Sequence, residues 1–124
     1  MGFISQSKVE AARQYWRQNL QNPVRMGNDE LITVTSVDFD HLIQDSRIRR
    51  KPFRIPLILE NIYEIYAAKQ ERRMGMSLWQ EGENQLQGYA ILDHGGTLRA
   101  MHIVRAQEAR RFKRQGELLW KRSE

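Results

Sequence analysis

Four short apolar segments separated by polar turns fill the second half of the chain, and they constrain the fold more than any other feature. The turn before the last segment contains Gly95-Gly96. A Gly-Gly pair between two apolar runs is a strong signal of a β-hairpin. The sequence therefore predicts a four-stranded antiparallel meander whose strands are Tyr63–Gln70, Met74–Gln80, Gln87–Asp93 and Thr97–Arg105.

The first part of the chain predicts a helix and then a strand. Residues Ser7–Leu20 place apolar side chains near one helical face, and Ser7 followed by Glu10 has the spacing of a capping box. Asn22-Pro23 is expected to end this helix. The short β-branched run Leu31–Thr35 predicts a strand.

The middle of the chain predicts two further helices around a cationic segment. We expect Ser36 to cap a short helix over Val37–Gln44. The cationic segment Arg47–Arg54 contains Pro52 and should be partly loop. The apolar run Ile55–Ile62 is consistent with a helix that leads into a strand.

A C-terminal helix is expected over Ala106–Arg114 and should stop at Gly116. Leu118–Trp120 should dock on the sheet as a last strand or turn. Helices that precede strands indicate an α+β fold, with N-terminal helices on one face of a four- to five-stranded antiparallel sheet. At 124 residues the chain is expected to be one domain, 1–124.

Composition narrows the class of protein. The chain has no cysteine, which excludes disulfide scaffolds, thiolate metal sites and cysteine nucleophiles. No apolar run approaches the roughly 18 residues of a membrane span, and no signal-peptide pattern opens the chain. We therefore expect a soluble cytoplasmic protein. Delivery as part of a larger exported protein stays open.

The charge balance points to a polyanionic partner. Twenty Lys and Arg residues against fifteen Asp and Glu give a net charge of +5. Fifteen of the cations are arginine, whose planar guanidinium binds phosphate and stacks on bases. Nucleic acid is the expected partner, although a basic composition can also be that of an ordinary soluble protein.

His41 lies just before the densest group of cations. A histidine exchanges protons near neutral pH, and metal-independent RNA cleavage needs a base, an acid and cations around the phosphate. His41 is therefore a candidate catalytic residue, or else a surface histidine paired with Asp40 or Asp45. The cations either contact phosphate or form a solvated charge run: Arg47, Arg49, Arg50, Lys51 and Arg54.

His102 is a second candidate. Strict alternation would place it on one strand face with Leu98 and Val104, where a hydrogen-bonded core histidine competes with a catalytic one. His94 lies in the hairpin turn and is expected to be exposed.

A second basic cluster follows the last sheet strand. Its members are Arg105, Arg110, Arg111, Lys113 and Arg114. Phe112 and Trp120 lie nearby, as in proteins that bind single strands, unless both rings belong to the core. Core packing is also expected for the rings of Tyr63, Tyr66, Trp79 and Tyr89, any one of which would otherwise be free to stack on a base.

No metal or nucleotide motif accompanies these residues. The chain lacks HExxH, a close pair of histidines, a Walker loop and GxGxxG. We expect no metal and no cofactor.

The order of these pieces resembles the barnase–EndoU–colicin–RelE-like (BECR) nuclease superfamily, especially its phage and toxin branches, over residues 31 to 122. Where members often carry Asn-Pro before the first sheet strand, this chain has Asn61-Ile62. The matching pieces are Asp40-His41-Leu42, the segment Arg47–Arg54, the strand YEIYAAKQ, the hairpin GYAILDHGGTLRAMHIVRA and the closing GELLWKR.

The resemblance implies a toxin-like endoribonuclease that acts by 2′-hydroxyl transesterification, with tRNA among the expected substrates. It implies catalytic roles for His41, for Arg47 or Arg50, and for His102 and Arg105. It also implies an acidic inhibitor or immunity protein. Two other interpretations stay open: a non-catalytic nucleic-acid-binding or regulatory module, and a phage or mobile-element interaction protein.

Overall fold

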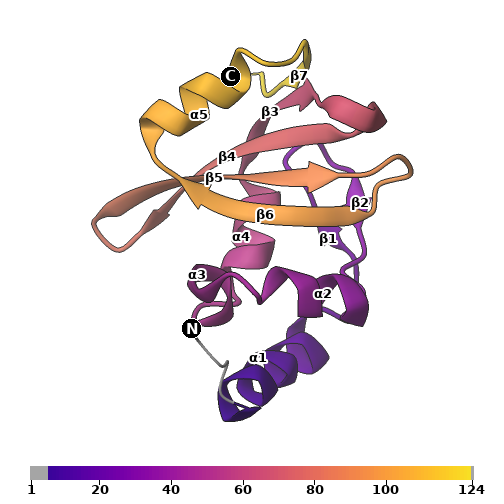
Figure 1. Cartoon of the computed structure of the whole chain (residues 1–124), viewed down its shortest axis with the longest axis vertical. Helices are drawn as coiled ribbons and strands as arrows, with labels where there is room; N and C mark the ends of the chain where they lie inside the picture. Colours follow the sequence, from indigo (N-terminus) through magenta and orange to yellow (C-terminus); the bar gives the residue numbers. More distant parts are fainter. Residues whose placement is uncertain (1–5, 124) are drawn as a thin grey trace.

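A five-stranded antiparallel sheet organises the protein, as a computed structural model of residues 6–123 shows (Figure 1). The strands are β3 (Ile62–Ala67), β4 (Arg73–Glu81), β5 (Asn84–Leu92), β6 (Leu98–Val104) and β7 (Leu118–Lys121). Their order across the sheet is β6-β5-β4-β3-β7. The predicted meander is confirmed, and the C-terminal strand joins it by pairing with β3.

The turns explain where the strands end. β3 stops at Ala67, before the predicted Gln70, because Lys69–Glu71 forms a 3₁₀ turn. Gln70 and Glu71 have φ values of 62° and 60° there, outside the extended conformation that a strand needs. The Gly95-Gly96 hairpin is confirmed, with φ values of 92° and 88°.

Five helices and a small hairpin complete the described chain. The helices are α1 (Gln6–Asn19), α2 (Ser36–Leu42), α3 (Ser46–Arg49), α4 (Arg54–Glu60) and α5 (Ala106–Lys113). The hairpin pairs β1 (Val24–Arg25) with β2 (Leu31–Ile32), so the predicted strand Leu31–Thr35 is shorter than expected. None of the helices within residues 6–123 has the length and apolar character needed to cross a membrane.

Both predicted helix caps are wrong. α1 already includes Gln6, so Ser7 lies inside its first turn. In α2 the cap is Thr35, one residue before the predicted Ser36, because Thr35 is extended and its hydroxyl accepts a 3.1 Å hydrogen bond from the Asp38 backbone N–H.

The cationic segment is more helical than predicted. Asp45 caps α3, its carboxylate accepting a 2.8 Å hydrogen bond from the Arg47 backbone N–H. α4 then begins at Arg54 and contains Pro56 in its first turn, where a backbone N–H has no intrahelical partner to lose.

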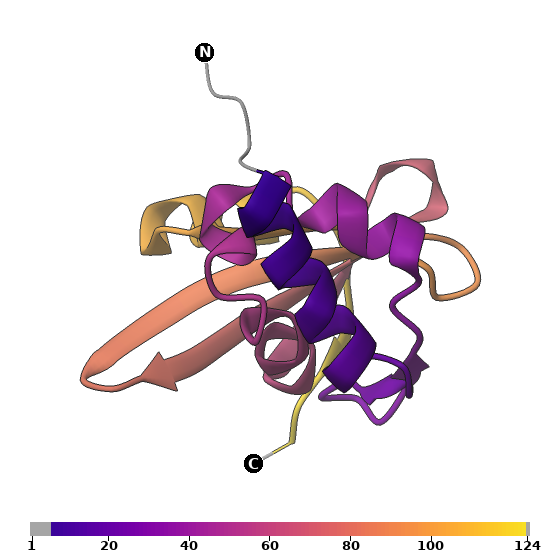
Figure 2. The same ribbon diagram turned by 90° about the horizontal axis from the view of Figure 1, so that it is seen from below.

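The two faces of the sheet pack differently. One face meets the N-terminal helices and builds a large core that includes Phe39, Ile58 and Leu59. Figure 2 views the molecule from the side of α1, with α1 nearest the viewer and the strands behind it. The other face meets α5 and builds a small core from Tyr66, Met74, Met76 and Ala109. We call these the packed face and the open face.

Candidate functional site

Two adjoining hollows lie on the open face. The first has a volume of about 520 Å³ and the second about 360 Å³. They share Arg72, Ile91 and Ala100, and we refer to the two together as the groove. The first is lined further by Val37, Asp38, His41 and Arg99, and the second by residues that include Lys69, Met74, Tyr89, His102, Phe112 and Gln115.

α2 brings His41 to the groove. The helix packs beside β6, the edge strand of the sheet, and the exposed His41 side chain lines the first hollow. Asp38, one helical turn earlier, lines the same hollow, and its Oδ2 is buried without a hydrogen-bond partner. The groove therefore contains a carboxylate as well as cations.

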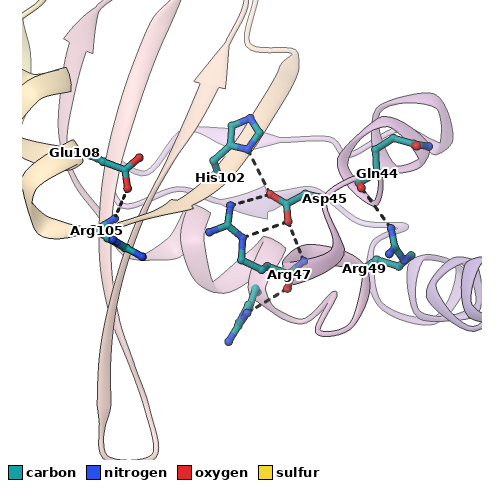
Figure 3. Close-up of polar contacts among 8 residues, drawn as sticks. Gln44, Asp45, Arg47, Arg49, His102, Arg105 and Glu108 are labelled. Carbon is teal, nitrogen blue, oxygen red and sulfur yellow. Dashed lines mark hydrogen bonds and ion pairs between the residues drawn. The ribbon is translucent and has the colours of Figure 1, made fainter. Parts of the chain in front are cut away.

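β6 brings His102 to the groove from the sheet itself. Its side chain is 44% exposed and its ring lies 5.4 Å from the Tyr89 ring, centre to centre. Its Nδ1 is 3.4 Å from Oδ2 of Asp45, and Figure 3 shows the imidazole directed at that carboxylate.

The predicted face of β6 needs a correction. The pairing with β5 shifts between Ile91 and Leu92, so strict alternation fails at the start of the strand. Leu98 is buried in the large core and does not share the face of His102. His102 therefore has the solvent access that a proton-transferring group needs.

Arg72 and Arg99 form a pair of fixed cations in the groove. Arg72 Nε donates to Asp93 Oδ1 at 2.7 Å, and Arg99 Nε lies 3.0 Å from Asp93 Oδ2. One carboxylate thus holds both guanidinium groups, while each keeps further N–H groups for another acceptor. Two such forks beside one hollow suit a phosphate group.

The five cations of the Arg47–Arg54 segment have different partners. Arg47 contacts Asp45, with Nη2 3.4 Å from Oδ2, so it lies near His102 (Figure 3). Arg49 turns inward and donates to the carbonyls of Ile43 and Gln44 at 2.9 and 3.3 Å. Arg49 is thus part of the helical scaffold.

Arg54 Nη1 donates to the Arg47 backbone carbonyl at 3.1 Å, but the side chains of Arg54 and Lys51 are held mainly by Glu81. Arg54 Nε donates to Glu81 at 2.8 Å, and Lys51 Nζ lies 3.7 Å from the same carboxylate. Hydrogen bonds from Arg54 lower the pKa of Glu81, and they outweigh the opposing effect of burial. Arg50 lines a separate hollow with Lys8, beside α1. Of the two arginines that the resemblance offered as alternatives, Arg47 lies near His102 and Arg50 lies in this separate hollow.

The second basic cluster belongs mostly to α5. Its exposed side chains are those of Arg105, Arg110, Arg111 and Arg114. Lys113 instead lies 2.7 Å from Glu64 and over the ring of Tyr63.

Some aromatic residues lie in the core and two line the groove. Tyr66 and Trp79 are buried, as expected of core residues, and Trp120 packs against the large core. Tyr89 and Phe112 are half-buried, contact each other with ring centres 4.9 Å apart, and line the second hollow. These two rings line the groove, where a base can reach them.

Sequence reasoning missed Arg72, Arg99 and Asp93. Arg72 stands in a polar turn, and Arg99 and Asp93 flank the Gly-Gly hairpin. The usable signal was the hairpin itself, because it brings the end of β5 and the start of β6 together. Within residues 6–123 no three His, Asp or Glu side chains lie close enough to hold a metal ion.

Comparison of the chain with protein-family models, curated proteins and solved structures gave no match. The resemblance to the BECR superfamily therefore stays a prediction, and function has to be argued from the groove.

Proposed function

We propose that the protein is a metal-independent endoribonuclease that cleaves RNA by 2′-hydroxyl transesterification. The supporting observation is that His41, His102, Arg72 and Arg99 line adjoining hollows on one face of the sheet. A groove with two titratable imidazoles and two guanidinium groups contains the types of group that this reaction needs.

The reaction assigns a task to each type of side chain. One histidine removes the proton of the 2′-hydroxyl, whose oxygen then attacks the adjacent phosphorus. The bond from phosphorus to the 5′-oxygen breaks, and the other histidine protonates that oxygen. Arg72 and Arg99 stabilise the negative charge that builds on the phosphorane oxygens. The products are a 2′,3′-cyclic phosphate and a free 5′-hydroxyl.

The substrate is proposed to be single-stranded RNA, such as a tRNA loop in the cytoplasm. Splayed bases can reach the half-buried rings of Tyr89 and Phe112, whereas a duplex hides its bases. If the protein is toxic, an acidic inhibitor is the expected partner, because it would complement the cations of the groove.

The test is cleavage of total cellular RNA in excess EDTA by the wild type and by His41→Ala and His102→Ala. We expect discrete fragments with cyclic phosphate ends, and a loss of about 10²–10⁴-fold in rate for each variant. His94→Ala is the matched control, because His94 is exposed in the hairpin turn outside the groove. Intact RNA with the wild type would contradict the proposal.

A non-catalytic RNA-binding module is the second candidate. The exposed arginines Arg105, Arg110, Arg111 and Arg114 of the α5 region favour it, because they suit backbone contacts without any acid or base. RNA retained in a gel shift but never cleaved would support this candidate over the nuclease.

A further inference from the structure

We propose that Asp45 is a positioning residue that holds His102 as the general base of the cleavage reaction. In this arrangement Nδ1–H of His102 donates to Asp45, and the Nε2 lone pair takes the 2′-hydroxyl proton. The inference rests on the proposed nuclease function and deepens it, because that function leaves base and acid unassigned between the two histidines.

The Asp45 carboxylate is held in place by its own helix. Its Oδ1 accepts the 2.8 Å hydrogen bond from the Arg47 backbone N–H that caps α3. The Arg47 side chain adds contacts of 3.5 Å to Oδ1 and 3.4 Å to Oδ2. The side chain is 15% exposed, and Oδ2 is the atom that faces His102 at 3.4 Å (Figure 3).

The charge of Asp45 decides the tautomer of His102. Burial alone would raise the pKa of Asp45, but hydrogen bonds from the backbone and side chain of Arg47, and from His102, outweigh it and lower this pKa. A carboxylate that is charged at neutral pH accepts hydrogen bonds and cannot donate one. Nδ1 of His102 therefore carries the proton, which leaves Nε2 unprotonated in the neutral ring.

The charged and titratable groups around His102 come from three parts of the fold. Asp45 and Arg47 approach from α3 and the residue before it. Tyr89 contacts the ring from β5, and Lys69 and Arg72 line the same hollow from the β3–β4 connection. Asp45 is the carboxylate among them, so it stabilises the imidazolium that forms when His102 takes a proton.

His41 then serves as the acid. It is exposed in the adjoining hollow, where it can exchange its proton with water between turnovers. The groove would place base and acid on opposite sides of Arg72, Ile91 and Ala100, which the two hollows share.

The test is ¹⁵N NMR of the His102 imidazole at about pH 8.5, where histidine is neutral, combined with pH–rate profiles. The key variant is Asp45→Asn, because asparagine caps helices as well as aspartate does and should keep α3 intact. We expect an Nδ1–H tautomer in the wild type. In the variant we expect loss of that tautomer, a loss of about 10²–10⁴-fold in the cleavage rate, and a changed basic limb of the pH–rate profile.

Asp40→Asn is the matched control. Asp40 is also paired with an arginine, with Arg13 Nε 3.0 Å away, but it lines a different hollow beside α1. This variant should keep both the His102 tautomer and the cleavage rate.

Two failures can be told apart. A wild type that leaves RNA intact overturns the nuclease function, and the catalytic use of the pair with it. A wild type that cleaves RNA overturns the role of Asp45 alone if His102 is the Nε2–H tautomer, or if Asp45→Asn cleaves at the wild-type rate.

Discussion

The two faces of the sheet differ in how completely helices cover them. On the packed face, Ile55, Ile58 and Leu59 of α4 are fully buried among side chains from α1, α2 and the strands. On the open face, α5 covers part of the sheet and leaves Ile91 and Ala100 lining the groove. Both faces belong to the same strands, so the contrast arises from the helices.

The packed face supplies most of the stability of the fold, whereas the open face contains the candidate functional side chains. Burial of apolar side chains supplies most of the free energy of folding, and the packed face has most of that burial. The open face keeps side chains of the groove in contact with water, and that of His102 is 44% exposed. Substitutions on the two faces should therefore have different consequences.

The largest expected effect comes from the packed face. Leu59→Ala should lower the free energy of unfolding by about 2–5 kcal/mol, because it leaves a cavity where the side chain is fully buried. Ile91→Ala on the open face should lower it by less than about 2 kcal/mol, because Ile91 is half-buried. Urea unfolding followed by circular dichroism measures both. Equal losses would remove the contrast between the faces.

Low pH should reduce the stability of the fold through Glu81, which pairs with Arg54 of α4 on the packed face. Its pKa lies below the ordinary value of 4.5, so Glu81 stabilises the fold above that pH and loses the contribution as pH falls through the lowered pKa. Glu81→Gln should cost about 1–3 kcal/mol at neutral pH, because it weakens bonds to Arg54 and Trp79. When the free energy of unfolding is measured at several pH values across this range, it should change less with pH for the variant than for the wild type. An unchanged pH dependence would contradict the assignment.

A smaller effect is expected from the arginine pair of the groove. Arg72→Gln or Arg99→Gln should weaken RNA binding by about tenfold. The slope of log binding constant against log salt concentration should become shallower by roughly 0.7 for each phosphate that the variant no longer neutralises. Stability should change by less than about 1 kcal/mol, because the pairs with Asp93 are partly exposed. Arg25→Gln, in an exposed ion pair with Asp29, is the control. The measurement is fluorescence anisotropy with labelled RNA.

The smallest effect concerns Asp38. Asp38→Asn removes the carboxylate that lines the first hollow, so repulsion of phosphate decreases. We expect RNA affinity to rise by about two- to fivefold, the size of one charge interaction near water. A lower affinity would show that this carboxylate contacts the RNA or positions His41.

The sequence predicts this fold best where local chemistry decides the outcome. The Gly-Gly pair identified the hairpin between β5 and β6, and the short apolar segments separated by polar turns identified the meander. The predicted face of Leu98 was wrong because the register of the β5–β6 pairing shifts after Ile91. That register depends on how the two strands pair, and neither strand's sequence encodes it alone.

The candidate site was predicted in part. His41 and His102 were both identified, and the structure places both beside the groove. The density of cations in the Arg47–Arg54 segment overstated how many of them are free to bind phosphate. Arg49 donates to a backbone carbonyl, and Arg54 is paired with a carboxylate. Arg72 was missed because its neighbours in space come from distant segments.

The pairing of β7 with β3 has a consequence for the order of folding. Neighbouring strands β3 to β6 are joined by short turns, so their pairing closes small loops. The pairing of Tyr66 with Leu118 instead closes a loop of about 50 residues, which costs more chain entropy. We therefore expect β7 to dock late in folding and to open early, so that its amides exchange with solvent faster than those of β4.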